Sequence, residues 1–184
     1  VLGIGGNDFV LISPGTLELR KGQDVVLSAW AEILEKVPNA RLVLLGDAGT
    51  GRGQAIADSV DAGTYGFSVR RIASQPSALK YLYASDALLF PSRAEAMPRT
   101  VPEAMAFGMP IVASAVDGIP ELLEDGVTGL LFEPSDPGSM VEGIRRIAAQ
   151  SAEAERLARA ARRRYNTHFS RKKQIERVGD LLDW

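Results

Sequence analysis

Short apolar segments recur along the chain, and within each one the apolar residues are nearly continuous rather than alternating with polar residues. The clearest begin at Phe9 (FVLIS), Arg41 (RLVLLG), Asp86 (DALLFPS), Pro110 (PIVAS) and Thr128 (TGLLFE), and a weaker one begins at Phe67 (FSVRRI). β-Strands that are buried on both faces have this pattern. The segments therefore predict the strands of a parallel sheet that is covered on both sides.

Stretches of helical period separate these segments. One helix is predicted over QDVVLSAWAEILEKV, where apolar residues recur from Val26 to Val37, and another over PSALKYLYAS, at Leu79 and Leu82. Strands that alternate with helices form right-handed βαβ units. We therefore expect an α/β fold: a Rossmann-like parallel sheet flanked by helices on both faces.

The pattern becomes purely helical after Glu133, with breaks near PSDPGS and NTHFS. We predict a linker over residues 1–8, one Rossmann-like domain over 9–150, and a helical tail over 151–184 that packs on the same domain. The first residues, VLGIGGNDF, are typical of a linker that runs into a strand, as in a fragment cut at a domain boundary.

Composition narrows the class of protein. A hydrophobic share of 46% in 184 residues suits one globular domain. The sequence contains no membrane-length apolar run, no leader pattern and no lipidation signal, so we expect neither a membrane span nor export. The absence of cysteine excludes disulfides and thiolate nucleophiles. A cytoplasmic location is the simplest expectation.

The net charge of −2 hides an asymmetry. Residues 151–184 hold nine Arg or Lys against five Asp or Glu, which leaves the remaining residues with twelve against eighteen. Such a tail suits an anionic membrane surface, an acidic partner or nucleic acid. We favour a solvated helix face over these, because Leu157, Ala161 and Tyr165 recur at helical spacing. Attachment to the inner face of a membrane stays open, and no nucleic-acid partner is expected.

Ligands of such sheets bind beyond the carboxyl ends of the strands. The loop LLGDAGTGRGQAI, after the second strand, has four glycines between Gly46 and Gly53, but it matches neither the dinucleotide fingerprint nor the Walker loop. A flexible loop near a ligand is favoured over a nicotinamide site. After the first strand, SPGTLELRKGQD places Arg20 and Lys21 before Gly22 at a predicted helix start. Cations beside a helix N-terminus bind anions, phosphate above all, although exposed loop charges are the alternative.

The stretch RAEAMPRTVPEA contains two glutamates. Thr100 as N-cap and Glu103 as the third helical residue have the spacing of a capping box, with Pro102 tolerated in the first turn. Capping does not account for Glu95, which lies in the preceding loop. A carboxylate there can accept hydrogen bonds from ligand hydroxyls, as sugar binding requires.

From these residues a family resemblance follows. The segment PSRAEAMPRTVPEAMAFGMPIVASAVDGIPELLEDGVTGLLFEP resembles the donor-binding signature of retaining GT-B glycosyltransferases of family 4 (glycosyl transferases group 1). Their pattern has two glutamates separated by seven residues, then E-A-M-A-x-G-x-P, G-x-x-E and D-G-x-x-G. Upstream, GTLELRKGQD, which begins at Gly15, resembles the G-R-L…K-G phosphate loop of that family.

The resemblance implies that Glu103 holds the ribose hydroxyls of a nucleotide-sugar donor and that Glu95 contacts the transferred sugar. It implies that Lys21 and a nearby arginine neutralise the diphosphate, and that backbone N–H groups of residues 97–100 cradle the sugar and the β-phosphate. The developing charge of the leaving diphosphate would be stabilised by these groups. Neither cofactor nor metal is expected: the sequence has no Asp-x-Asp pair, and its single histidine, His168, has no ligand partners nearby.

The sequence departs from the family pattern at two positions. Thr16 stands where the family usually has arginine, so we assign the second diphosphate cation to Arg20. Pro98 stands where a glycine often follows the first glutamate, and it has no N–H to donate. The backbone contact is therefore lost or displaced to Arg99. The expected site comprises Glu95, Lys21 and Arg20 as catalytic residues, and for donor binding Gly15, Thr16, Arg20, Lys21, Glu95, Met97, Pro98, Arg99, Thr100 and Glu103.

We thus expect the donor-binding half of a retaining glycosyltransferase that uses a UDP, GDP or ADP sugar. An N-terminal domain of the same polypeptide would bind the acceptor, and this chain alone would bind nucleotide weakly without transferring sugar. The alternative is a non-catalytic nucleotide-binding or partner-binding module of the same fold.

Overall fold

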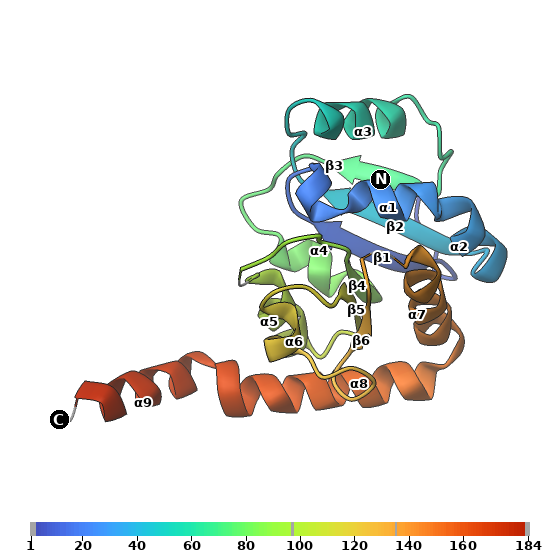
Figure 1. Ribbon diagram of the computed structural model, residues 1–184. Helices are drawn as coiled ribbons and strands as arrows, with labels where there is room; N and C mark the ends of the chain where they lie inside the picture. Colours follow the sequence, from blue (N-terminus) through green and yellow to red (C-terminus); the bar gives the residue numbers. More distant parts are fainter. Residues whose placement is uncertain (1–2, 97, 135, 183–184) are drawn as a thin grey trace.

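The six predicted strands all form, and they lie in one parallel sheet (Figure 1). The computed structural model describes residues 3–96, 98–134 and 136–182. The strands are β1 (Phe9–Pro14), β2 (Ala40–Leu45), β3 (Val69–Ile72), β4 (Ala87–Phe90), β5 (Ile111–Ser114) and β6 (Leu130–Phe132). Their order is β3-β2-β1-β4-β5-β6, with Leu11 of β1 opposite both Leu42 and Ala87. The chain therefore reverses its winding direction between β1 and β4, where a parallel sheet opens its ligand crevice.

Helices cover both faces of this sheet. Short helices follow the first strands: η1 (Leu19–Lys21, a 3₁₀ turn), α1 (Gln23–Ser28), α2 (Trp30–Lys36), α3 (Arg52–Asp61) and α4 (Leu79–Tyr83). The later ones are α5 (Thr100–Phe107), α6 (Ile119–Leu122), α7 (Pro137–Ala149), α8 (Ser151–Arg164), η2 (Tyr165–Phe169, a π-helix) and α9 (Arg171–Leu182). The predicted α/β fold with helices on both faces is confirmed.

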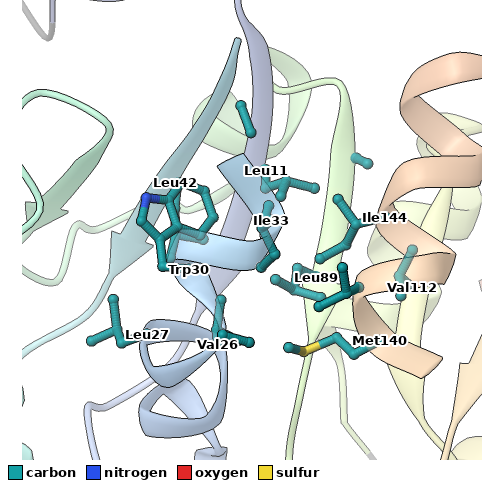
Figure 2. Close-up of a cluster of buried hydrophobic side chains, with 14 of the residues drawn as sticks. Leu11, Val26, Leu27, Trp30, Ile33, Leu42, Leu89, Val112, Met140 and Ile144 are labelled. Carbon is teal, nitrogen blue, oxygen red and sulfur yellow. The ribbon is translucent and has the colours of Figure 1, made fainter. Parts of the chain in front are cut away.

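Alternate residues of each strand point to opposite faces of the sheet and pack into two separate hydrophobic cores. Leu11 and Leu42 face α1, α2, α3 and α7, and Figure 2 shows Trp30, Ile33 and Ile144 converging over this face. The neighbouring residues of the same strands, Val10 and Ile12 among them, face α4, α5 and α6. Because strand side chains alternate between faces, burial on both sides explains why the apolar segments are continuous.

The single helix predicted over residues 23–37 is wrong in one detail. Ala29 leaves helical geometry (φ −93°, ψ 1°), which divides the segment into α1 and α2. Backbone bonds from Ala29 N–H to Val25 O (3.1 Å) and from Ile33 N–H to Ala29 O (3.0 Å) nevertheless keep the two pieces in line. The apolar positions continue across the break, so their periodicity carries no sign of it.

The tail divides into two parts. On α8, Leu157 and Ala161 are fully buried, and Arg164 donates to the carbonyls of Leu122 (2.9 Å) and Glu121 (3.0 Å) at the end of α6. Arg164 therefore links α8 to α6, so this positive charge of the tail has a structural role. By contrast, α9 points away from the sheet in Figure 1. Within the described ranges, no helix is long and apolar enough to cross a membrane.

Gly22 lets the chain after β1 reach the chain after β4. Its φ is +71°, and a Cβ on this residue would overlap with the carbonyl oxygen of Pro91. Gly66 has a similar φ of +58°, but no atom lies near the position of its Cβ. The two glycines therefore differ in their surroundings and not in their backbone conformation.

This difference predicts unequal costs for one substitution. Gly66→Ala is expected to lose about 1 kcal/mol of unfolding free energy from backbone strain alone. Gly22→Ala is expected to lose about 3 kcal/mol, because overlap with a backbone carbonyl adds to that strain. Urea unfolding followed by the fluorescence of the buried Trp30 measures both losses. Equal losses would show that the approach of Gly22 to Pro91 matters little.

Candidate functional site

A cleft of ≈ 490 Å³ opens beyond the carboxyl ends of β1 and β2. Its walls are Pro14, Gly15, Thr16, Leu45, Gly46, residues 74–79, Arg99, Thr100 and Glu103. The location agrees with the expectation for a parallel sheet. A more apolar groove of ≈ 370 Å³ lies near Phe9 and Asp86, at the amino-terminal ends of β1 and β4, and contains none of the predicted site residues.

The β1–η1 loop forms one wall of the cleft. Gly15 lies beside the alkyl chain of Lys21, since a Cβ added to this glycine would be 3.4 Å from Lys21 Cε. The buried amide of Gln23 holds this loop, because its Nε2 donates to Thr16 O (3.2 Å) and its Oε1 accepts from Glu18 N–H (3.5 Å). Gln23 was not singled out in the sequence, where nothing distinguishes a buried amide from a surface one.

The glycine-rich loop serves close packing. A Cβ on Gly46 would overlap with Gly15 O, and one on Gly53 would overlap with Leu17 O. The absent side chains therefore allow the loops after β1 and β2 to touch each other. Gly46 lines the cleft, whereas Gly53 lies in α3 and serves packing.

Beside the cleft, Glu95 gathers the two predicted cations. Its side chain is 8% exposed and forms an ion pair with Lys21, whose side chain is 17% exposed. Arg20 Nη1 lies 3.6 Å from the same carboxylate oxygen, and Ser92 Oγ donates to it at 3.1 Å. The structure thus places Arg20, Lys21 and Glu95 in one cluster.

Arg93 links the segment after β4 to η1 and α1. Arg93 forms a two-bonded pair with the Asp24 carboxylate (2.7 and 2.9 Å), and Arg93 N–H donates to Arg20 O (2.7 Å). The hydrogen bonds to Asp24 raise the pKa of Arg93 above its ordinary value, against the opposing effect of burial. Arg93 and Asp24 were missed in the sequence because they lie far apart along the chain.

The predicted capping box is wrong. Helix α5 begins at Thr100 rather than after it, Arg99 occupies the N-cap position, and no side chain caps the helix. Arg99 already has helical dihedral angles (φ −70°, ψ −30°), so the chain enters the helix one residue earlier than the capping pattern requires. The Glu103 N–H donates to Arg99 O (3.1 Å), and the Glu103 side chain lines the cleft instead of reaching back to the cap.

Burial shifts the pKa of Glu103. Desolvation raises the pKa of its carboxyl above the ordinary value, and the positive charge of Arg99 opposes this rise without cancelling it. A half-buried carboxylate at a cleft wall is a hydrogen-bond acceptor that lacks part of its hydration.

The structure thus brings most of the predicted residues to one edge of the sheet. Gly15, Thr16, Arg99, Thr100 and Glu103 line the cleft, and the Glu95 cluster adjoins it through Gly15. Pro98 instead borders a neighbouring groove, which Tyr165 and Phe169 also line. Met97 lies outside the described residues.

Residues 74–78 were missed, although all five line the cleft. They follow β3, and the rule that loops after parallel strands line the crevice would have found them. Over the described ranges, no group of three His, Asp or Glu side chains gathers into a possible metal site.

Sheet order, crevice position and the cation cluster define the class: a Rossmann-like domain of the kind found in GT-B glycosyltransferases. The chain belongs to the family described as glycosyl transferases group 1, whose family model matches residues 1–164. The resemblance drawn from the sequence motifs is therefore confirmed.

Two relatives are named D-inositol 3-phosphate glycosyltransferase. The protein from Nocardioides sp. is 31% identical over 175 residues, which cover 87% of this chain and 38% of that protein. The one from Actinosynnema mirum is 35% identical over 166 residues, which cover 85% of this chain and 40% of that protein. The chain thus spans about two fifths of the length of these relatives.

Two solved structures resemble this chain in fold. Anabaena Alr3699/HepE in complex with UDP has a TM-score of 0.87 and 25% identity, with 98% of this chain and 50% of that chain covered. The C-terminal domain of a Francisella tularensis glycosyl transferase group 1 family protein, LpcC, has a TM-score of 0.78 and 19% identity, with 91% and 89% covered. The second likeness concerns the fold alone, and it spans nearly all of both chains.

Burial of Glu103 predicts a pH-dependent change in stability. Because its folded-state pKa is raised, the wild type loses stability as pH rises through that pKa. Glu103→Gln removes this loss, so the variant is expected to be modestly more stable than the wild type at pH 7, with an advantage that shrinks towards about pH 4. Urea unfolding at the two pH values tests this, with the exposed Glu32→Gln as control. A variant that is less stable at pH 7 would contradict the assignment.

Proposed function

We propose that the chain is the donor-binding domain of a glycosyltransferase that transfers a sugar from a nucleoside-diphosphate sugar with retention of anomeric configuration. The observation that carries the proposal is the Glu95 cluster: two cations and a buried carboxylate beside a cleft that contains a second carboxylate, Glu103. Cations suit a diphosphate and carboxylates suit sugar hydroxyls, so one edge of the sheet offers both kinds of partner.

The nucleoside half of the donor belongs in the cleft. Glu103 is the residue for the ribose hydroxyls, because its carboxylate lacks part of its hydration and accepts hydrogen bonds in exchange. UDP is the first nucleotide to test, since Anabaena HepE was crystallised with UDP and with UDP-glucose. GDP and ADP sugars remain alternatives for this chain.

The diphosphate belongs between Lys21, Arg20 and the first turn of α5. Arg20 is 51% exposed and therefore free to turn from Glu18 and Glu95 towards an anion, which supports it as the substitute for the arginine missing at Thr16. Negative charge grows on the diphosphate as the sugar departs, and fixed cations and helix N–H groups stabilise that charge more than the ground state.

Donor binding then becomes an exchange of ion-pair partners. In the free chain Lys21 is paired with Glu95, so an incoming diphosphate competes with this carboxylate for the ammonium group. Once Lys21 and Arg20 turn to the diphosphate, the buried Glu95 carboxylate has lost both cations and keeps its hydrogen bond from Ser92. A sugar hydroxyl that donates to Glu95 relieves this loss, which couples sugar recognition to diphosphate binding.

The acceptor site is proposed to lie in another domain of a longer polypeptide. The curated relatives are more than twice the length matched by this chain, which leaves room for such a domain. Independence from metal, a cytoplasmic location and contact with an anionic membrane through the tail stay predictions.

Removal of the Lys21 charge tests the diphosphate assignment. Lys21→Met is expected to weaken UDP binding by about tenfold or more, because a charge-assisted hydrogen bond to a phosphate is lost. The control is Lys36→Met, which removes the same charge from an exposed position at the end of α2. Titration calorimetry with UDP, GDP and ADP gives the affinities. If the wild type binds none of them at millimolar concentration, the proposed function is wrong.

The variant Glu95→Gln separates two proposed roles of Glu95: its competition with the diphosphate for Lys21, and its recognition of the sugar. The variant frees Lys21, so UDP is expected to bind a few-fold more tightly than to the wild type. The additional affinity for UDP-glucose over UDP, which we term the sugar advantage, is expected to fall, because a neutral amide is a weaker acceptor. Glu32→Gln controls for net charge, and calorimetry measures both affinities. Weaker UDP binding by Glu95→Gln would refute the exchange of partners.

A further inference from the structure

The turn between β5 and α6 lies against the backbone of Glu95. Asp117 Oδ2 accepts a hydrogen bond from Glu95 N–H at 2.7 Å. On the other side of the same residue, Gly118 N–H donates to Glu95 O at 3.3 Å. The N–H and C=O groups of Glu95 are thus both held by two consecutive residues of one turn.

Gly118 makes this contact sterically feasible. A Cβ on Gly118 would overlap with the carbonyl oxygen of Ala96, so a larger residue would push the turn away from the loop that carries Glu95. The turn and the loop therefore fit together at Glu95 itself, and not only through the strands beneath them.

Asp117 adopts a costly backbone conformation to make its bond. Among the described residues other than glycine, Asp117 alone has a positive φ, +46°. Such a conformation costs a non-glycine residue of order 1 kcal/mol or more, although aspartate and asparagine tolerate it better than most. Glycine would fit this φ without strain, so the backbone gives no reason for an aspartate here. The carboxylate does, because it is the group that bonds to Glu95.

Two buried serines orient the side-chain end of the same glutamate. Ser114 Oγ, at the end of β5, donates to Ser92 O at 2.5 Å. Ser92 Oγ in turn donates to Glu95 Oε1 at 3.1 Å. Both serines are buried, with exposed fractions of 0% and 1%. Backbone and carboxylate of Glu95 are therefore fixed by groups from the ends of β4 and β5.

We propose that Asp117 is a positioning residue for Glu95: by holding the Glu95 N–H, it fixes where the carboxylate stands when Lys21 turns to the diphosphate. The inference rests on the proposed function, in which Glu95 accepts a hydrogen bond from the transferred sugar. In the part of the chain that the structure describes, Asp117 is not among the residues that line the cleft, and it forms no ion pair with Arg20 or Lys21. Its effect should therefore fall on the sugar and spare the nucleotide.

Two substitutions separate the hydrogen bond from the backbone strain. Asp117→Gly and Asp117→Asn both accept a positive φ, but only asparagine retains a side-chain oxygen that can accept from Glu95 N–H. Unfolding midpoints of both variants verify that the fold persists. The two proteins then differ chiefly in the bond under test.

The first measurement is the amide proton of Glu95 in the free chain, observed by NMR and by hydrogen exchange. In the wild type and in Asp117→Asn it is expected to be protected and hydrogen-bonded. In Asp117→Gly its resonance is expected to shift upfield and its exchange to accelerate about tenfold. An unchanged amide in Asp117→Gly would overturn the proposal, because the bond would then not hold Glu95.

The second measurement is the sugar advantage of each variant by calorimetry. The probes are UDP with UDP-glucose, GDP with GDP-glucose and ADP with ADP-glucose, and the pair that the wild type binds most tightly is used. Asp117→Gly is expected to lose about fivefold of the sugar advantage and to bind the bare nucleotide within about twofold of the wild type. Asp117→Asn is expected to retain most of the advantage.

The outcomes distinguish the two proposals. If the wild type binds a nucleotide sugar and Asp117→Gly keeps the full sugar advantage, the positioning role fails while the proposed function stands. If Asp117→Gly weakens bare nucleotide and nucleotide sugar equally, Asp117 only supports the fold and the positioning role fails as well. If the wild type binds none of the six probes, the proposed function fails and the inference falls with it.

Discussion

The site depends on the close approach of two chain segments that leave neighbouring strands, one after β1 and the other after β4. Gly22 allows this approach because it has no Cβ to meet Pro91 O, and the pair of Arg93 with Asp24 holds it from the solvent side. A parallel sheet with a switch point between β1 and β4 opens a crevice there in any case. The same contact brings Lys21 onto Glu95, so that the cation and the carboxylate are paired in the free chain.

Burial has different electrostatic consequences for the two carboxylates, Glu95 and Glu103. A buried carboxylate is stable only when it is paired or hydrogen-bonded, and Glu95 obtains its partners from Lys21 and Ser92. Glu103 is treated differently, since desolvation raises its pKa and Arg99 compensates only in part. One carboxylate is thus paired within the protein, and the other is the one that we propose for the ribose hydroxyls. In that proposal, the desolvation that raises the pKa of Glu103 lowers the stability of the free chain, and a ligand hydroxyl that donates to the carboxylate offsets it.

The sequence predicted the sheet well, because continuous apolar segments such as the one at Leu42 have few alternatives to a strand buried on both faces. The site was predicted less completely. The capping box failed because Arg99 continues the helical backbone, which side-chain spacing alone does not reveal. The pair of Lys21 with Glu95 could not be predicted from local pattern, since the two residues lie 74 positions apart and meet only through the order of the strands. Motif resemblance identified both residues without showing that they bind each other.

In such a site, specificity depends on the difference in free energy between two pairings of Lys21, one with Glu95 and one with a diphosphate. It does not depend on the strength of either pairing alone. In the proposed exchange, a diphosphate that pairs with Lys21 gains one ion pair but breaks the one with Glu95, so the net gain in affinity is smaller than either interaction alone. The sugar enters this balance through the partner that Glu95 has lost, and the gain is largest when the carboxylate keeps its position during the exchange. The strained backbone of Asp117 is consistent with a requirement to keep Glu95 in place. The hydrogen bond from Glu95 N–H to Asp117 costs backbone energy in the free chain, and in the proposed exchange it prevents Glu95 from following Lys21.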